Sequence, residues 1–301
     1  MRPPEPDAGA TASAPPAPRV SVCIPTYRGA ATLGPAIESV LAQRFGDFEL
    51  VIVDDQSPDD TAAVVARYAD PRIRYHRNER NLGPQGNWNR CLALARGTYF
   101  KLLPHDDLLH PDCLLEQVAV LDADADARLA LVFCARDVLG PDGRVLAARG
   151  YRGAPEGRLA ARALMRACVH RGTNVIGEPG AVLCRRALSE RIGGFDARQP
   201  YVIDLDHWFR LLCHGDAWHQ TRRLASFRVS AQQWSVALSR QQSQDFNAFI
   251  ERIAPQVGLR LGRLDRARSR GMAALNNLLR RVFYRVFLRP EAGARGHGRA
   301  S

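Results

Sequence analysis

Short apolar runs alternate with helical patterns along the first 135 residues. The runs are too short for most helices and predict strands, whereas apolar residues that recur every three or four positions predict helices. Strands that alternate with helices usually pair in parallel, so we expect an α/β fold with a mostly parallel sheet and helices on both faces. The predicted strands are residues 20–24, 49–53, 72–76, 98–103 and 129–133, and the predicted helices are residues 32–43, 60–69, 84–95 and 111–121.

Beyond about residue 136 the pattern is less regular. The last predicted element, residues 273–289, places Leu, Val and Phe at helical spacing with arginines on its other sides, which is typical of an amphipathic basic helix. Residues 1–18, rich in Pro and Ala, predict a flexible leader outside the fold. Between these segments we expect a loop at 140–156, a helix near 158–169, a turn-rich stretch at 172–180, a strand at 181–184 and a helix at 204–214.

The positive charge of the chain is concentrated near its C-terminus. The formal charge is +11, and the segment from Glu251 onward contributes +9 of it, with 12 arginines against 3 acidic residues. No nucleic-acid-binding motif accompanies this excess, so we expect no nucleic-acid partner. The C-terminal helix either lies on an anionic membrane surface or packs on the protein with its arginines in solvent.

Cysteine usage and hydropathy bear on the compartment. The seven cysteines are scattered singly, without a C-x-x-C pair, which favours reduced, buried thiols in a cytoplasmic protein. No apolar run reaches the roughly 18–20 residues of a membrane span, and the N-terminal residues lack an apolar signal segment. We therefore expect a cytoplasmic protein, in solution or on the inner face of the cell membrane.

Polar clusters follow four of the predicted strands. They are residues 25–28, 54–57, 77–83 and 104–107. Ligands of parallel α/β sheets bind beyond the carboxyl ends of the strands, so these clusters are the candidate site. The Asp54-Asp55 pair could accept hydrogen bonds from a base N–H or a ribose hydroxyl, or it could only cap the helix that follows.

A second acidic pair, Asp106-Asp107, also stands at a strand end. Adjacent carboxylates repel each other unless a cation lies beside them. Mg²⁺ or Mn²⁺ takes oxygen ligands and completes its shell with water and substrate phosphates, which predicts a divalent metal that binds a diphosphate ligand. The alternative is that the pair caps the helix that begins near Pro111.

Taken together, the motifs resemble the family 2 glycosyltransferases of the GT-A fold, a Rossmann-like nucleotide-binding architecture. The resemblance extends over residues 19–227. The motifs are VSVCIPTY at 20–27, VIVDDQS at 51–57, NLG at 81–83 followed by Asn87 and Asn89, GTYF at 97–100 and DDLLHPD at 106–112.

The resemblance implies a donor site in the first half of the chain. An acid of the Asp54-Asp55 pair would meet the base, and Asp106 or Asp107 would meet the metal. Family members usually carry an acid two residues before Asp106, where this chain has Pro104, so the ribose or metal contact of that acid is in doubt. His105 either replaces it or has no ligand role. The full set implied for the donor is Pro25, Thr26, Tyr27, Asp54, Asp55, Asn81, Gly83, His105 and Asp106.

Inverting transfer needs a base that deprotonates the acceptor hydroxyl. Asp204 matches the family's acceptor-side acidic motif, although Ile203 stands where a glutamate is common; alternatively Asp204 is a helix N-cap and Asp206 a first-turn charge. Trp208 and Trp234 would stack on a sugar ring or lie in the core. Three further segments fit the family's acceptor side or a loop over the diphosphate: residues 174–179, 193–196 and 228–235.

The resemblance therefore implies an inverting transferase for a metal-bound nucleoside-diphosphate sugar, with a uridine diphosphate sugar favoured. The acceptor would be a saccharide or a lipid-linked saccharide in cell-envelope or extracellular polysaccharide synthesis. The rival functions are nucleotidyl transfer, for which Arg77 and Arg80 offer a basic clamp, and a non-catalytic scaffold on the same fold. The expected organisation is a leader at 1–18, a donor half at 19–135, an acceptor half at 136–235 and a helical, Arg-rich extension at 236–301.

Overall fold

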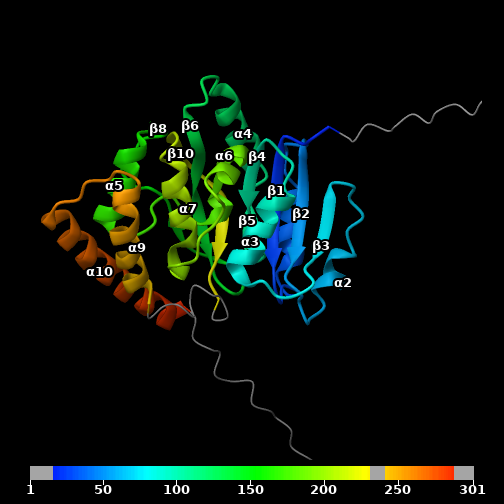
Figure 1. Ribbon diagram of the computed structural model, residues 1–301. Coiled ribbons are helices and arrows are strands. Elements are labelled where there is room, and N and C mark those ends of the chain that lie inside the picture. The colour runs from blue at the N-terminus through cyan, green and yellow to red at the C-terminus, as the bar shows by residue number, and fades with distance from the viewer. Residues whose placement is uncertain (1–15, 231–240, 288–301) are drawn as a thin grey trace, which may run out of the picture.

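The computed structural model describes residues 16–230 and 241–287. Within them the strands form one mixed sheet in the order β3-β2-β1-β4-β9-β6-β10-β5, with β7 paired to β6 and β8 paired to β10. β3 lies at one end of the molecule, and the last helices gather at the other end (Figure 1). The predicted leader lies almost entirely outside the described residues.

The first half of the chain folds as the alternating pattern predicts. Strands β3, β2, β1 and β4 are parallel neighbours in that order, and a helix follows each of the first three strands along the chain. At the turn before β4, a Cβ on Gly97 would lie 2.5 Å from the backbone nitrogen of Ser21, so only glycine allows this close approach. The elements are β1 (Val20–Thr26), α1 (Leu33–Leu41), β2 (Phe48–Asp54), α2 (Thr61–Val65), β3 (Ile73–Arg77), α3 (Gly83–Leu94) and β4 (Tyr99–Leu102).

The second half contains antiparallel pairs. β9 is antiparallel to both β4 and β6, so it joins the two parts of the sheet. The prediction of a loop at 140–156 is wrong, because this segment contains β7, which forms an antiparallel hairpin with β6. The helix expected near 158–169 begins only after β8. The elements are β5 (Leu108–Leu109), α4 (Cys113–Ala123), β6 (Leu129–Leu139), β7 (Val145–Arg149), β8 (Gly157–Leu159), α5 (Ala161–Arg171), β9 (Val182–Arg185), α6 (Arg186–Arg191), α7 (Ile203–Leu211) and β10 (Asp216–Arg228).

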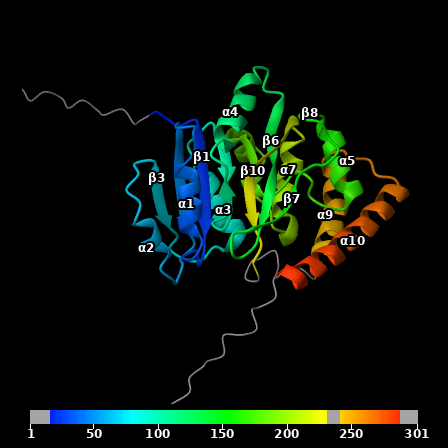
Figure 2. The same cartoon turned by 180° about the vertical axis from the view of Figure 1, so that it is seen from behind.

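Two helices end the described chain, α9 (Gln242–Gln256) and α10 (Arg263–Phe287). The sequence pattern did not predict α9, and α10 begins ten residues before the predicted start at Ala273. α10 packs against α5 and α9 (Figures 1 and 2). None of the described helices combines the length and the apolar character that a membrane crossing needs.

The sheet separates two apolar cores because alternate side chains of a strand point to opposite faces. Val22, Ile24 and Ile52 belong to the core under α1 and α4, whereas Cys23 and Val51 belong to the core under α3, α5, α7 and α9. Figures 1 and 2 show these two helical layers on either side of the sheet. Six of the seven cysteines are buried, as expected, but Cys213 is exposed.

Candidate active site

The loops that follow β1 and β2 are tied together by side chains of the second loop. The backbone N–H groups of residues 28–30 donate, in order, to Ser57 Oγ (2.9 Å), Thr61 Oγ1 (3.0 Å) and Asp59 Oδ2 (3.1 Å). Helix α2 begins after this loop with Asp60 as its N-cap, so neither Asp54 nor Asp55 caps that helix. The segment DDQSPDDT at 54–61 therefore holds the loops after β1 and β2 side by side.

Both loops contain a strained residue. Arg28 and Gln56 have φ values of 54° and 61°, a left-handed conformation that non-glycine residues rarely adopt. Each such residue costs about 1–3 kcal/mol and is retained where the surroundings fix it, which is common at functional sites. Both turn the chain directly beyond the sheet edge where ligands of such folds bind.

Asp54 is fully buried and holds its own loop together. Its Oδ1 accepts the backbone N–H of Ser57 (2.8 Å), and its Oδ2 accepts the hydroxyl of Tyr75 (2.7 Å). The guanidinium of Arg77 lies 3.7 Å from the same Oδ2. The carboxylate is thus occupied by partners from β3 and from its own turn.

Asp55, 2% exposed, organises the loop before α3. Its Oδ1 accepts the side-chain amide of Asn78 (2.8 Å) and the N–H of Leu82 (2.8 Å), and its Oδ2 accepts the N–H of Gly83 (2.9 Å). The side-chain amide of Asn81 donates to the backbone oxygen of Asp55 (3.1 Å). The two predicted residues Asn81 and Gly83 therefore meet Asp55, while contact of any of them with a nucleotide stays a prediction.

Thr26, Tyr27 and His105 gather around the turn after β1. A Cβ on Gly29 would lie 2.1 Å from Thr26 Oγ1 and 3.4 Å from the His105 ring, so the glycine admits both side chains. The buried Thr26 hydroxyl has no hydrogen-bond partner among the described residues. Tyr27 is 41% exposed beneath the guanidinium of Arg28. This group combines an unused hydroxyl with an exposed aromatic ring, both suited to a nucleoside.

Asp106 and Asp107 meet the end of β10. Asp107 is 1% exposed, and its Oδ1 accepts the backbone N–H of Arg228 (2.9 Å). The Arg228 side chain donates to the backbone oxygen of Asp106 (3.0 Å). Burial, together with the neighbouring charge of Asp106, raises the pKa of Asp107 well above its usual value. The rest of the predicted closing loop, including Trp234, lies largely outside the described residues.

The acidic pair fits a divalent cation. A cation beside the pair would favour the charged carboxylates, against the burial and the repulsion from Asp106 that raise the pKa of Asp107. Carboxylate oxygens are also the ligands that Mg²⁺ and Mn²⁺ prefer. Among the described residues, no group of three or more His, Cys, Asp or Glu side chains forms a complete metal cage. A metal at Asp106 would therefore draw most of its ligands from water and from the phosphates of a donor.

Asp204 lies in the first turn of α7, across the site from the donor loops. Its Oδ2 accepts the side-chain amide of Asn174 (2.9 Å), and its Oδ1 accepts the N–H of Leu205 (2.7 Å). Burial, together with the charge of Glu178, raises the pKa of Asp204 to about 7. The alternative that Asp204 is the N-cap is wrong, because Val202 occupies that position.

Glu178 lies in the segment 174–179 that the resemblance placed on the acceptor side, although no sequence pattern gave this residue a role of its own. Its carboxylate pairs with Arg136, and although burial opposes the shift, the charges of Arg136 and Arg149 hold the pKa of Glu178 below its usual value. Trp208, 2% exposed, donates its indole N–H to the backbone oxygen of Gly177 (3.2 Å). Trp208 therefore lies in the core and supports the loop at 174–180 instead of offering its ring to a sugar.

Lys101 joins the two sides of the site. Its fully buried ammonium donates to the backbone oxygens of Gly180 (2.8 Å) and Val182 (3.0 Å). A Cβ on Gly180 would lie 4.0 Å from Asp107 Oδ2, so the loop at 174–180 runs from Asp204 to the acidic pair. Lys101 is the single lysine of the chain, and no local sequence pattern gave it a role in the site.

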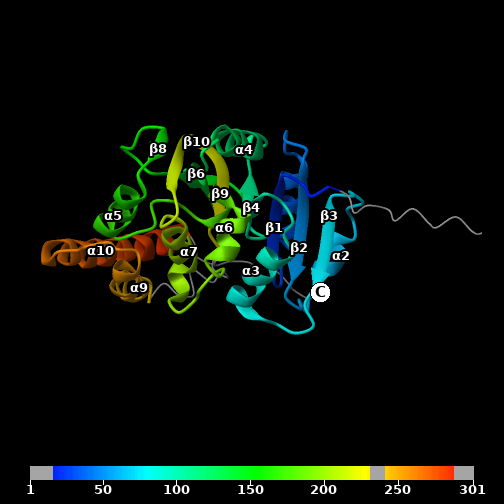
Figure 3. The same cartoon turned by 45° about the horizontal axis from the view of Figure 1, so that its top comes forward.

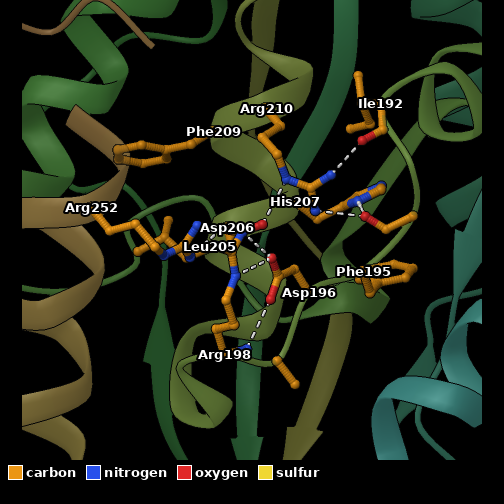
Figure 4. Close-up of polar contacts among 12 residues, drawn as sticks. Ile192, Phe195, Asp196, Arg198, Leu205, Asp206, His207, Phe209, Arg210 and Arg252 are labelled. Atoms are coloured by element: carbon orange, nitrogen blue, oxygen red, sulfur yellow. Dashed lines mark hydrogen bonds and ion pairs between the residues drawn. The ribbon is translucent and has the colours of Figure 1, made fainter. Parts of the chain in front are cut away.

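Helix α7 is fixed to the Gly-rich turn at 193–196, as Figure 4 shows. The Arg210 guanidinium donates to the backbone oxygens of Ile192 (2.8 Å) and Gly194 (2.6 Å). Asp206 is a first-turn charge of α7, as the alternative expected. It is only 1% exposed and pairs with Arg210 (2.7 Å) and with Arg252 of α9 (2.6 Å), so it is also the centre of a buried ion-pair cluster. Burial, aided by the charge of Arg210, lowers the pKa of His207 to about 3, so its ring is neutral and structural.

The strand-end motifs match a known family as a whole. Residues 21–191, more than half of the chain, fit the family model described as Glycosyl transferase family 2. The chain belongs to glycosyl transferase family 2. The matched segment contains the donor-side clusters, whereas Asp204 and helices α7, α9 and α10 lie beyond it.

Relatives of this family 2 chain include an uncharacterized protein and a protein named for succinoglycan biosynthesis. An uncharacterized protein of Mycobacterium tuberculosis (strain CDC 1551 / Oshkosh) is 35% identical over 215 residues, which are 68% of this chain and 66% of that protein. The succinoglycan biosynthesis protein ExoO of Rhizobium meliloti is 41% identical over 129 residues, which are 43% of this chain and 36% of ExoO. The chain thus matches less than two thirds of the length of each.

Solved structures share the fold. S. aureus TarS 1-349 in complex with UDP-GlcNAc superimposes with a TM-score of 0.64 at 18% identity, covering 91% of this chain and 77% of TarS 1-349. The mannosyltransferase PcManGT of Pyrobaculum calidifontis, in complex with GDP-Man and Mn²⁺, gives 0.60 at 19% identity, covering 93% and 77%. At this identity the likeness concerns architecture, and it confirms the predicted GT-A fold.

Proposed function

We propose that this family 2 protein is an inverting glycosyltransferase that uses a nucleoside-diphosphate sugar. The observation that carries the proposal is the Asp204 carboxyl, which is oriented by Asn174 and has a pKa of about 7. A base is most effective when its pKa is near the working pH, because it is then both ionised and basic. The loop at 174–180 connects this base to the acidic pair on the donor side.

The proposed reaction assigns one task to each side. On the acceptor side, the Asp204 carboxylate takes the proton of the acceptor hydroxyl as its oxygen forms a bond to the anomeric carbon of the sugar. The bond from that carbon to the diphosphate breaks on the opposite face, which inverts the configuration. A Mg²⁺ or Mn²⁺ ion held by Asp106, with Asp107 behind it, would neutralise the charge of the departing diphosphate.

On the donor side, the proposal assigns nucleoside binding to the group around Gly29. The unused Thr26 hydroxyl and the exposed Tyr27 ring support this assignment. Asp54 and Asp55 act mainly by fixing the surrounding loops, since each carboxylate already accepts several hydrogen bonds. His105 lies beside Gly29, where an acid of the family pattern is missing, and we assign it to the donor as well.

The printed names of the relatives support the substrate classes. ExoO is named for succinoglycan biosynthesis, and the TarS and PcManGT structures hold UDP-GlcNAc and GDP-Man. We propose a nucleoside-diphosphate sugar donor, with uridine as the favoured base, and a saccharide acceptor, free or lipid-linked, in cell-envelope or extracellular polysaccharide synthesis. Nucleotidyl transfer is disfavoured because Arg77 already donates to the backbone oxygen of Ser57 (3.0 Å) and lies beside Asp54.

Calorimetric titration tests the donor site. We would titrate uridine, guanosine and thymidine diphosphates and their sugars into the full chain with Mn²⁺, with Mg²⁺ and with chelator. One nucleotide should bind in a metal-dependent way, and Asp106→Ala should abolish the metal dependence. Asp126→Asn, which changes an exposed acid away from the site, should leave binding unchanged. If no nucleotide binds under any condition, the protein is a scaffold on the same fold and the proposal is wrong.

A further inference from the structure

Helix α10 packs on the protein through small and polar side chains and leaves large apolar side chains exposed, which is the reverse of an ordinary surface helix. The side chains of α10 that are fully buried are Ser269 and Ala273, both small. Its large apolar side chains point to solvent instead, with exposed fractions up to 60% in the second half of the helix. Leu264 and Phe287, at the two ends of the helix, are exposed as well. We call five exposed residues between them the apolar stripe: Leu275, Leu278, Leu279, Val282 and Val286.

The apolar stripe is one continuous face. At about 100° per residue, its five members fall within an arc of about 100°, and Ala273 lies on nearly the opposite side. A helix that packs only on its own protein normally turns such a face inward, because burial of apolar surface stabilises the fold. In α10 the packed side and the apolar side are therefore separated.

Close contacts fix the rotation of α10 about its own axis. A Cβ on Gly172, which ends α5 with φ of 60°, would lie 2.3 Å from the backbone nitrogen of Ala273. The side-chain amide of Asn276 donates to the backbone oxygen of Arg171 (2.6 Å), and Arg280 donates to the hydroxyl of Tyr201. These contacts hold the polar side against α5 and against the turn at 200–202 that precedes α7, so the helix cannot roll the apolar stripe inward.

The charged residues of α10 indicate which kind of surface the apolar stripe would bind. The helix contains seven arginines and one acid, Asp265. On the helical wheel, Arg281 and Arg285 flank the stripe on one side. An apolar face bordered by arginines matches a lipid surface, in which acyl chains take the leucines and valines and anionic headgroups take the guanidinium groups.

We propose that α10 docks this protein on an anionic membrane surface through the apolar stripe. The proposal rests on the proposed function for its purpose, because the same helix reaches the acceptor side of the site. Arg280 contacts Tyr201, which stands just before α7 and Asp204. The C-terminal end of α10 also lies toward the edge where β10 ends (Figures 1 and 3). Docking would bring Asp204 near the lipid surface, where a lipid-linked saccharide acceptor is found.

Vesicle co-sedimentation of the full chain tests the proposal. Phosphatidylcholine vesicles with phosphatidylglycerol should bind the protein, and pure phosphatidylcholine vesicles should bind it more weakly. The triple variant Leu278→Ser, Leu279→Ser, Val282→Ser should lower partitioning at least about tenfold, because it removes three apolar side chains from the interface. The double variant Leu115→Ser, Val145→Ser, which changes similarly exposed apolar residues elsewhere, is the matched control and should bind as the wild type does.

Charge variants separate the electrostatic contribution to vesicle binding from the apolar contribution. Arg281→Gln and Arg285→Gln should each weaken binding to the anionic vesicles about fivefold and leave binding to neutral vesicles unchanged. The proposal is overturned if the triple variant sediments with anionic vesicles as well as the wild type. It is also overturned if the wild type binds no vesicles and forms a dimer that the triple variant disperses, since the stripe would then be a contact between two copies.

Donor calorimetry keeps the two proposals apart. The triple variant should bind the nucleotide with unchanged affinity, because the stripe lies away from the donor loops, and this also shows that the variant is folded. Asp106→Ala should lose metal-dependent donor binding and still sediment with vesicles. Vesicle binding that depends on the stripe, without any nucleotide binding, would refute the proposed function and support the docking surface. Nucleotide binding without vesicle binding would support the proposed function and refute the docking surface.

Discussion

The proposed donor side and the proposed acceptor side of this molecule are held together by different interactions. On the donor side, carboxylates accept backbone and amide N–H groups from loops that follow neighbouring strands; Asp55 alone accepts three such bonds from residues 78–83. On the acceptor side, buried charges pair with each other, as Asp206 does with Arg210 and Arg252 and as Glu178 does with Arg136.

The difference shows how each side is specified. A carboxylate that accepts backbone N–H groups needs only a turn of the right geometry, so a short sequence motif is sufficient to specify the interaction. A buried ion pair gives little net stability, because desolvation offsets the attraction, but losing one partner is costly. The acceptor side therefore depends on partners from α7, α9 and β6 that must arrive together. The predictions below test this contrast, beginning with the largest effect.

Asp204→Asn should remove the proposed base while preserving the shape of the site. We expect transfer to fall about 10²–10⁴-fold, the usual contribution of a general base, with donor affinity unchanged. Initial rates and donor titrations measure the two quantities. Asp126→Asn, which changes an exposed acid away from the site, is the control and should keep full activity. Full activity of Asp204→Asn would refute the assigned base.

Asp55→Ala should break the donor side as a unit. The change removes the three hydrogen bonds that Asp55 accepts from Asn78, Leu82 and Gly83, which at about 1 kcal/mol each should cost about 3 kcal/mol of unfolding free energy. Donor affinity should fall with it, because the loop before α3 loses its anchor. Urea unfolding and nucleotide titration measure the two effects. Asp60 is exposed and, although it occupies the N-cap position of α2, its side chain makes no capping hydrogen bond, so the control Asp60→Ala should change neither quantity.

The pH dependence should report the Asp204 carboxyl. Its pKa of about 7 means that kcat/KM should rise about tenfold per pH unit below pH 7 and level off above it, since only the carboxylate accepts a proton. The same raised pKa makes the folded state the better proton binder, so it predicts stability that falls as pH rises from about 4 to 7. Asn174→Ala removes a hydrogen bond to the carboxylate and should move the kinetic midpoint upward. An unmoved midpoint would assign the pH dependence to another group.

Lys101→Met should weaken the link between the two sides. The loop at 174–180 would lose two hydrogen bonds to its backbone, while the removal of a buried charge limits the loss of stability. We expect the KM for the acceptor to rise about fivefold, as for the loss of about 1 kcal/mol of hydrogen bonding, with donor affinity unchanged. Acceptor saturation curves measure this. A larger change in donor affinity than in acceptor KM would place the influence of Lys101 on the donor side.

Periodicity predicted the donor side well because its signals are local. The strands at 20–24 and 49–53 are mostly apolar and are buried along their whole length, and the polar residues that follow them fall at the carboxyl edge as expected. Helix α9 could also have been predicted, because Phe246, Phe249 and Ile253 stand at helical spacing. β7 could not, because its half-exposed residues form a strand only by pairing with β6.

The acceptor-side partners left no signal in the sequence. Glu178 meets Arg136 across 42 residues, and Lys101 meets Gly180 across 79, so no local pattern connects them. Asp204 was found through the family resemblance alone, and its raised pKa depends on burial and on Glu178. The sequence likewise suggested an amphipathic C-terminal helix but could not show which of its sides packs, because that choice depends on the contacts at Gly172.

The buried position of Lys101 gives the protein a built-in chemical reporter. The chain has no other lysine, so its single ε-amine is shielded by the loop at 174–180. An amine-reactive label can reach it only when that loop opens locally or the whole domain unfolds. The rate of acylation at Lys101, read as a mass shift, therefore measures how often the acceptor side opens, without any mutation of the protein.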